Sequence, residues 1–106
     1  MDFKMKEQIL VLYADRAERS ILDPVVDELK QRDIAYNYLN LSKKIPEIHD
    51  DKNLSQIYDY IYKLVERENF TASLVIGDRR EIMFASLALF IKGIPIIQSV
   101  SYTHLR

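Results

Sequence analysis

Cysteine and tryptophan are absent from this sequence of 106 residues, and glycine occurs only twice. Without cysteine the chain can form no disulfide bond, no thiolate nucleophile and no cysteine-ligated zinc site. Gly77 and Gly93 cannot build a GxGxxG dinucleotide fingerprint or a Walker P-loop, because both motifs need closely spaced glycines. NAD and ATP sites of those kinds are therefore excluded.

An excess of charge of either sign is also lacking. The sequence has 15 basic and 16 acidic residues, mixed along its length, and a net charge of -1. This balance gives no electrostatic footprint for nucleic acid and no polybasic block for a membrane surface. The N-terminal MDFKMKEQ lacks the apolar stretch of a signal peptide, and no apolar run reaches the about 18 residues of a membrane span. We expect one cytoplasmic domain.

The hydrophobic pattern alternates between strand-like and helix-like segments. It predicts strands over 9–13, 34–41, 74–76 and 94–97, helices over 21–29, 54–65 and 79–92, and a loop over 42–53. Such alternation predicts an α/β fold, here a three-layer Rossmann-like half-domain with a parallel sheet of about four strands. Pro24 either kinks the first helix or begins a second segment with Asp23 as its N-cap. Gly93 is expected to stop the third helix.

The segment 82–91 (IMFASLALFI) is apolar on nearly all sides. A helix of that kind is typically buried all round. Four strands and three helices offer too little protein to cover it, so we expect further chain or a partner to pack there.

Two similar motifs follow predicted strands, Asp15-Arg16-Ala17-Glu18 and Asp78-Arg79-Arg80-Glu81. In each, two carboxylates stand three residues apart at the start of a helix, as in a capping box with Asp as the N-cap. Simple capping, worth about 0.5–2 kcal/mol for each cap, is one interpretation.

The same motifs also suit a ligand site. A helix N-terminus at the end of a strand attracts anions, and an arginine there adds a planar fork for phosphate. Arg16 and Arg79 would point into one cleft if the first and third strands are parallel neighbours. Asp78, preceded by the small Gly77, could take a proton from a substrate carbon or hydroxyl.

A family resemblance rests on two segments, ILVLYADRAERSILDPVVDEL (9–29) and LVIGDRREIMFASLALFIKGIPI (74–96). They resemble, in the same order, the opening segment and the strand–Gly-Asp-Arg–helix–Ile-Pro segment of UDP-N-acetylglucosamine 2-epimerases of the hydrolysing type. The resemblance implies a two-domain, glycosyltransferase-B-type enzyme of amino-sugar metabolism that eliminates UDP from its substrate. It implies that Asp78 is catalytic and that Arg16, Ser20 and Arg79 bind the substrate.

The resemblance leaves Asp15, Glu18 and Glu81 as helix caps or supports of the site. It implies no metal and no cofactor, and it names a UDP-sugar and a C-terminal domain as partners, with a homo-oligomer expected for the complete enzyme. The first loop departs from the family, since Ala14 and Asp15 replace the usual Gly and Thr. After Ile-Pro-Ile the family continues with His, whereas this chain reads Ile97-Gln98-Ser99.

The closing VSYTHLR resembles translated sequencing-adapter DNA. We therefore expect a lead-in over 1–8, a truncated Rossmann-like N-terminal domain over 9–98 and a non-native tail over 99–106. The later catalytic carboxylates and the second domain would then be missing, and the chain alone would be inactive.

Two other functions stay open. The chain could be a non-catalytic α/β module that binds a partner through the 82–91 helix, with both motifs acting only as caps. It could also be a glycosyltransferase subunit that uses the same UDP-sugar cleft.

Overall fold

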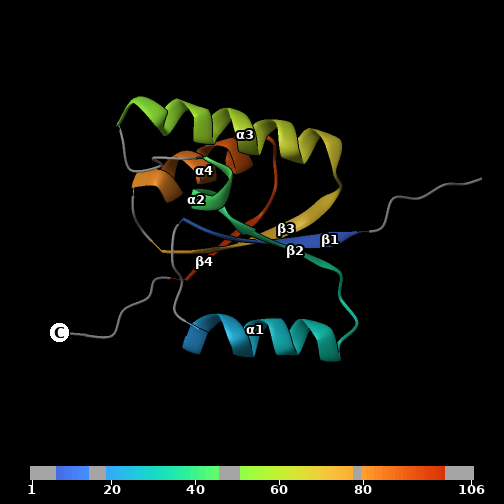
Figure 1. Cartoon of the computed structure of the whole chain (residues 1–106). Helices are drawn as coiled ribbons and strands as arrows, with labels where there is room; N and C mark the ends of the chain where they lie inside the picture. The colour runs from blue at the N-terminus through green and yellow to red at the C-terminus, as the bar shows by residue number, and fades with distance from the viewer. Residues whose placement is uncertain (1–6, 15–18, 46–50, 78–79, 100–106) are drawn as a thin grey trace, which may run out of the picture.

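A computed structural model describes residues 7–14, 19–45, 51–77 and 80–99 of the chain. Strands and helices alternate through these ranges, as the sequence pattern predicts (Figure 1). The elements are β1 (Gln8–Tyr13), α1 (Arg19–Gln31), β2 (Tyr36–Asn40), α2 (Leu41–Lys44), the 3₁₀ turn η1 (Asp51–Asn53), α3 (Leu54–Arg67), β3 (Phe70–Ile76), α4 (Arg80–Ile91) and β4 (Ile96–Ser99). No helix within the described ranges is long and apolar enough to cross a bilayer.

The four strands form one parallel sheet in the order β2-β1-β3-β4. Helix α1 covers one face of this sheet, and α3 and α4 cover the other (Figure 1). This arrangement makes three layers, and it confirms the predicted α/β class and the parallel sheet of four strands. Strands β1 and β3 lie at the centre, so their residues are nearly continuous apolar runs.

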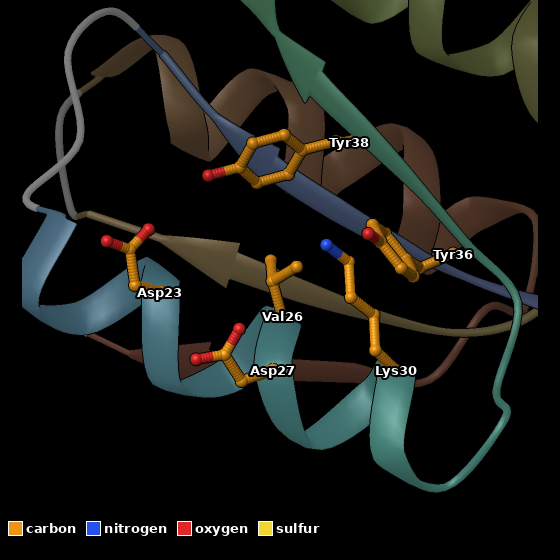
Figure 2. A pocket seen from close by; sticks show the side chains of 6 residues that line it. All are labelled: Asp23, Val26, Asp27, Lys30, Tyr36 and Tyr38. Atoms are coloured by element: carbon orange, nitrogen blue, oxygen red, sulfur yellow. The ribbon is translucent and has the colours of Figure 1, made fainter.

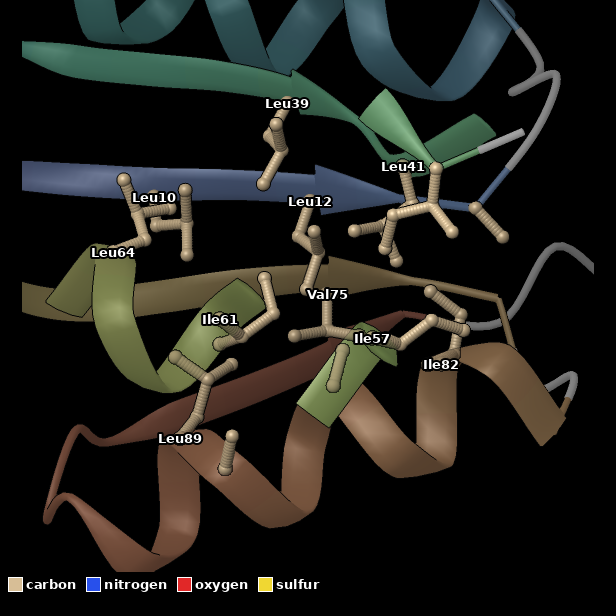
Figure 3. Packing of buried hydrophobic residues seen from close by; sticks show 14 of the residues in the cluster. Leu10, Leu12, Leu39, Leu41, Ile57, Ile61, Leu64, Val75, Ile82 and Leu89 are labelled. Atoms are coloured by element: carbon tan, nitrogen blue, oxygen red, sulfur yellow. The ribbon is translucent and has the colours of Figure 1, made fainter. Parts of the chain in front are cut away.

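Most of the core lies between the sheet and the α3–α4 layer. Figure 3 shows side chains from all three elements meeting there, among them Leu12, Ile61 and Leu89, each fully buried. On the α1 face the fully enclosed residues are fewer, with Val11 and Ile76 flanked by half-buried neighbours such as Leu29. The molecule is therefore held together mainly on one side of its sheet.

Helix α1 is one helix with Pro24 inside it. The alternative of a second segment that begins at Pro24, with Asp23 as its N-cap, is wrong. A proline removes its own N–H donor and disfavours a helix interior. Here Val25, Val26 and Leu29 lie half-buried against the sheet, and this packing along one face keeps the helix continuous across the proline.

The predicted strand over 34–41 and loop over 42–53 need correction. Strand β2 ends at Asn40, whose side-chain Oδ1 accepts hydrogen bonds from the backbone N–H (3.0 Å) and hydroxyl (2.9 Å) of Ser42. Asn40 thereby caps α2, whose first residue, Leu41, is fully buried. A short helix and the 3₁₀ turn occupy the predicted loop where the structure describes it, because an Asn cap favours helix over strand at this point.

The ends of α1 and α4 share one geometry. Gly93 (φ 76°) follows α4, its N–H bonds the Phe90 carbonyl (3.0 Å), and the next N–H, of Ile94, bonds the Leu89 carbonyl (2.9 Å). This pattern is a Schellman cap, and it confirms Gly93 as the helix stop. Because Ile94 belongs to the cap, β4 begins at Ile96 rather than at 94 as predicted. The predicted start of the third strand also needs correction, since β3 begins at Phe70 rather than at 74.

Candidate functional site

The carboxyl ends of β1 and β3 lie side by side, with Tyr13 opposite Ile76 in the parallel register. The first and third strands are therefore parallel neighbours, the condition set above for the two motifs to serve one site. After β1 the chain passes to α1 on one face of the sheet, and after β3 it passes to α4 on the other face (Figure 1). The two strands therefore flank the switch in strand order, where parallel α/β sheets open a crevice for ligands.

Most of the predicted site residues lie outside the part of the chain that the structure describes, namely Asp15, Arg16, Glu18, Asp78 and Arg79. Ser20 belongs to the first turn of α1, but its side chain also lies outside the described part. The structure fixes where these residues are attached, at the ends of two neighbouring strands. Their catalytic and binding roles stay predictions.

Glu81 is the predicted site residue that the structure describes fully. It lies in the first turn of α4, and its side chain is only 2% exposed. A carboxylate is rarely this buried without compensating interactions. The partial positive charge of the α4 N-terminus favours a negative group at this position. Glu81 is thus an interior side chain in the first turn of α4 rather than a solvent-exposed one.

Gly77 connects β3 to the second motif and has φ of 109°. A Cβ built there would lie 3.7 Å from Ile82 Cγ1, an ordinary contact, so the backbone conformation rather than lack of space calls for glycine. The Gly77 carbonyl accepts a hydrogen bond of 2.7 Å from Nε2 of Gln98. Gln98 of β4 therefore fixes the peptide directly before Asp78.

Sequence reasoning recognised Gln98 only as a departure from the epimerase pattern. The sequence does contain a signal for this role. Gln98 is a polar side chain that directly follows the apolar pair Ile96 and Ile97, near the carboxyl end of a strand. The resemblance to the family weakens one residue earlier, at Ile97, where a His is usual.

A second support, at the end of β1, was also missed. The Ala14 carbonyl accepts a hydrogen bond of 2.8 Å from the N–H of Ser42, at the start of α2. Asn40 holds Ser42 in place as the cap of that helix. The signal in the sequence is the Asn-Leu-Ser pattern directly after a strand. The carbonyls directly before the two Asp-Arg-X-Glu motifs thus accept hydrogen bonds from neighbouring segments, one from α2 and one from β4.

These features give the crevice a chemistry that suits anions. Helices α1 and α4 both begin beside it, from opposite faces of the sheet, and helix N-termini carry free N–H groups and a partial positive charge. Within the described ranges no three acidic or histidine side chains are grouped closely enough to hold a metal ion.

A separate hollow of about 300 Å³ lies between α1 and β2. Figure 2 shows Asp23, Asp27 and Lys30 of α1 facing Tyr36 and Tyr38 of β2 across it. Two carboxylates at its wall disfavour a phosphate. This hollow runs along the side of α1, away from the strand ends, and does not belong to the predicted site.

Together, the strand order and the fixed strand ends define a doubly wound parallel α/β protein with a candidate ligand crevice at its switch point. The chain matches no protein-family model, no curated protein and no solved structure. Its function must therefore be argued from the crevice itself.

Proposed function

We propose that this chain is the N-terminal part of a UDP-N-acetylglucosamine 2-epimerase of the hydrolysing type. The observation that carries the proposal is the attachment of both Asp-Arg-X-Glu motifs to the two strands that flank the switch in strand order. A glycosyltransferase-B-type enzyme binds its nucleotide sugar at such an edge, between two domains.

In the proposed reaction the substrate loses the proton on C2 of its sugar while the bond from C1 to the UDP oxygen breaks. The electron pair of the C–H bond forms the C1–C2 double bond, and UDP leaves with the pair of the C–O bond. Water then adds across the double bond, and the reprotonation of C2 on the opposite face gives N-acetylmannosamine. Asp78, which follows Gly77 in the sequence, is the acid/base group in this scheme.

The diphosphate of the substrate is the ligand of Arg16, Ser20 and Arg79 in this proposal. Arginine forms bidentate, charge-assisted hydrogen bonds to phosphate oxygens. The N-termini of α1 and α4 add two partial positive charges from opposite faces of the sheet. Glu81, an interior side chain, supports the first turn of α4.

A second α/β domain closes the crevice in the proposed enzyme and supplies the remaining catalytic carboxylates. Catalysis depends on stabilising the transition state in a closed site. We therefore expect the 106-residue chain alone to bind UDP-N-acetylglucosamine weakly and to release no UDP from it. The surrounding biology would be amino-sugar metabolism and the synthesis of surface polysaccharides.

Calorimetric titration of the chain with UDP-N-acetylglucosamine tests the proposal. Arg16→Ala and Arg79→Ala should each weaken binding by roughly 10–100-fold, the cost of losing a charge-assisted hydrogen bond. Arg32→Ala and Arg67→Ala are matched controls, since both arginines are exposed, Arg32 directly after α1 and Arg67 at the end of α3, away from the carboxyl ends of the strands. Equal binding by all four variants would contradict the proposed site.

The enzymatic part of the proposal is tested on the product of the complete gene, obtained by reading the source DNA past codon 98. Asp78→Asn should abolish the release of UDP and leave substrate binding nearly unchanged. Retained turnover in that variant would remove Asp78 from the mechanism.

A further inference from the structure

The hollow of about 300 Å³ between α1 and β2 has one charged wall and one aromatic wall. Its lining residues are Asp23, Val26, Asp27 and Lys30 of α1, and Tyr36 and Tyr38 of β2 (Figure 2). A hollow of this size is at the lower end of the range of about 300–1,000 Å³ that is usual for ligand pockets. It therefore suits a small ligand, and its walls decide which chemistry that ligand must have.

The aromatic wall is held in place by the sheet itself. The ring of Tyr38 lies against the ring of Tyr13 of β1, with centroids 5.4 Å apart and planes inclined by 54°. Tyr36 is half-buried and packs against the cluster of Val11 and Ile76. Because positions 36 and 38 are two apart in a strand, both rings lie on the same face of the sheet. The wall is thus already formed in the free protein.

The charged wall carries both signs along one side of α1. Asp23, Asp27 and Lys30 follow one another at spacings of four and three residues, which places them in a row. The row is about 10 Å long, since each helical residue adds about 1.5 Å. Asp27 and Lys30 are both exposed, yet neither forms an ion pair with any residue that the structure describes. Both charges are therefore open to a ligand.

The charges and the rings together specify a ligand with groups of both signs. Two carboxylates against one ammonium leave one negative charge in excess, so the matching ligand carries one positive charge in excess. Tyrosine faces attract cations, and a planar guanidinium also stacks on them. The ammonium of Lys30 attracts a carboxylate at the other end of the row.

We propose that this hollow binds a free basic amino acid, and that arginine fits it best. The carboxylate of the ligand meets Lys30, and its α-ammonium group meets Asp27. Its guanidinium group lies at Asp23, over the ring of Tyr38. Figure 2 shows Lys30 on the side of Tyr36 and Asp23 on the side of Tyr38, which is the order that this pose requires. None of the crevice residues takes part, so the inference does not rest on the proposed reaction.

Other classes of ligand match the hollow less well. A phosphate would meet the carboxylates of Asp23 and Asp27. A divalent metal ion would lie beside the ammonium of Lys30, and the described residues offer no group of three acidic or histidine ligands. An apolar ligand would leave three charged side chains unmatched. A basic amino acid uses all three charges and the aromatic wall.

Calorimetric titration of the 106-residue chain with L-arginine tests the inference. The wild-type chain should bind arginine with a Kd below about 1 mM, and Asp27→Asn should weaken binding by roughly 5–10-fold. Glu28→Gln is the matched control, since Glu28 is the next residue of α1 but pairs with Arg32 (2.6 Å) and does not line the hollow. Circular dichroism shows whether each variant is folded.

Analogues of arginine test the pose group by group. Argininamide lacks the carboxylate, so Lys30→Gln should weaken the binding of arginine by roughly fivefold but should not weaken that of argininamide. Citrulline has the shape of arginine without the guanidinium charge. It should bind the wild-type chain about 10-fold more weakly than arginine, and Asp23→Asn should reduce that difference.

Three results would each overturn the inference. These are no binding at millimolar arginine, a loss in Glu28→Gln as large as that in Asp27→Asn, and equal losses of arginine and argininamide binding in Lys30→Gln. A change in UDP-N-acetylglucosamine binding would bear only on the proposed function.

Discussion

The two strand–helix units β1–α1 and β3–α4 begin and end alike but differ between those ends. Both carry an Asp-Arg-X-Glu motif after a central strand, and both helices end in a Schellman cap. The outer side of α1 exposes Asp23, Asp27 and Glu28 to solvent, whereas α4 exposes Met83 and Phe90. The units thus share their two ends, whereas their outer sides differ, polar in α1 and apolar in α4.

The inner sides of the two helices differ as well. Ile82, Ala85 and Leu89 of α4 are fully buried against α3 and the sheet (Figure 3). Among the described side chains of α1, residues 23–31, none is fully buried. Helix α4 therefore packs tightly on its inner side and is apolar on its outer side. Helix α1 packs less tightly, and its outer side is polar.

The largest effect should come from truncating the inner side of each helix. Leu89→Ala leaves a cavity in the main core and should cost about 2–5 kcal/mol of unfolding free energy. Leu29→Ala, at a half-buried position of α1, should cost clearly less. Urea unfolding at neutral pH measures both. Equal losses would show that α1 is anchored as firmly as α4.

Substitutions at the residue directly after each central strand should have an intermediate effect on the free energy of unfolding. Gly77→Ala forces a side chain onto a backbone with φ of 109° and should cost about 1–3 kcal/mol. Ala14→Gly, at the equivalent place after β1, should cost only about 0.5–1 kcal/mol through backbone entropy and a lost methyl group. Thermal unfolding followed by circular dichroism compares the two. An unchanged melting temperature in Gly77→Ala would mean that the fold does not require the positive φ at this residue.

The smallest effects concern the two helix ends, and they should have opposite signs. Asp33 takes the left-handed conformation (φ 57°) in the cap of α1, the position that Gly93 (φ 76°) holds in the cap of α4. Asp33→Gly should therefore stabilise the protein by up to about 1 kcal/mol, and Gly93→Ala should destabilise it by about as much. Urea midpoints resolve both shifts. A loss of stability in Asp33→Gly would contradict the shared cap geometry.

The sequence predicts the central layers of this fold well, because apolar periodicity reports directly on burial. The stripe over 54–65 became α3, in which Tyr58 stacks on Tyr62 with ring centroids 5.8 Å apart. The apolar character of 82–91 on nearly all sides also indicated that four strands and three helices would not cover this helix, and the structure leaves Met83 and Phe90 exposed.

Individual polar contacts account for the features of the fold and the site that the sequence did not predict. Asn40 ended β2 and began α2, although the strand-like composition continues to Leu41. Gln98 reached the Gly77 carbonyl across a distance of 21 residues in sequence. The second contact depends on which strands become neighbours, and the order β2-β1-β3-β4 emerges only from the assembled sheet.

The most direct test of the central claim is an NMR titration of the ¹⁵N-labelled chain with UDP-N-acetylglucosamine. If the ligand binds at the switch in strand order, the amide signals of Ala14, Gly77 and Ser42 should shift progressively. Those of Asp33 and Gly93, at the far ends of α1 and α4, should stay in place. Shifts confined to the hollow between Asp27 and Tyr36, or no shifts at millimolar ligand, would contradict a nucleotide-sugar site between the two motifs.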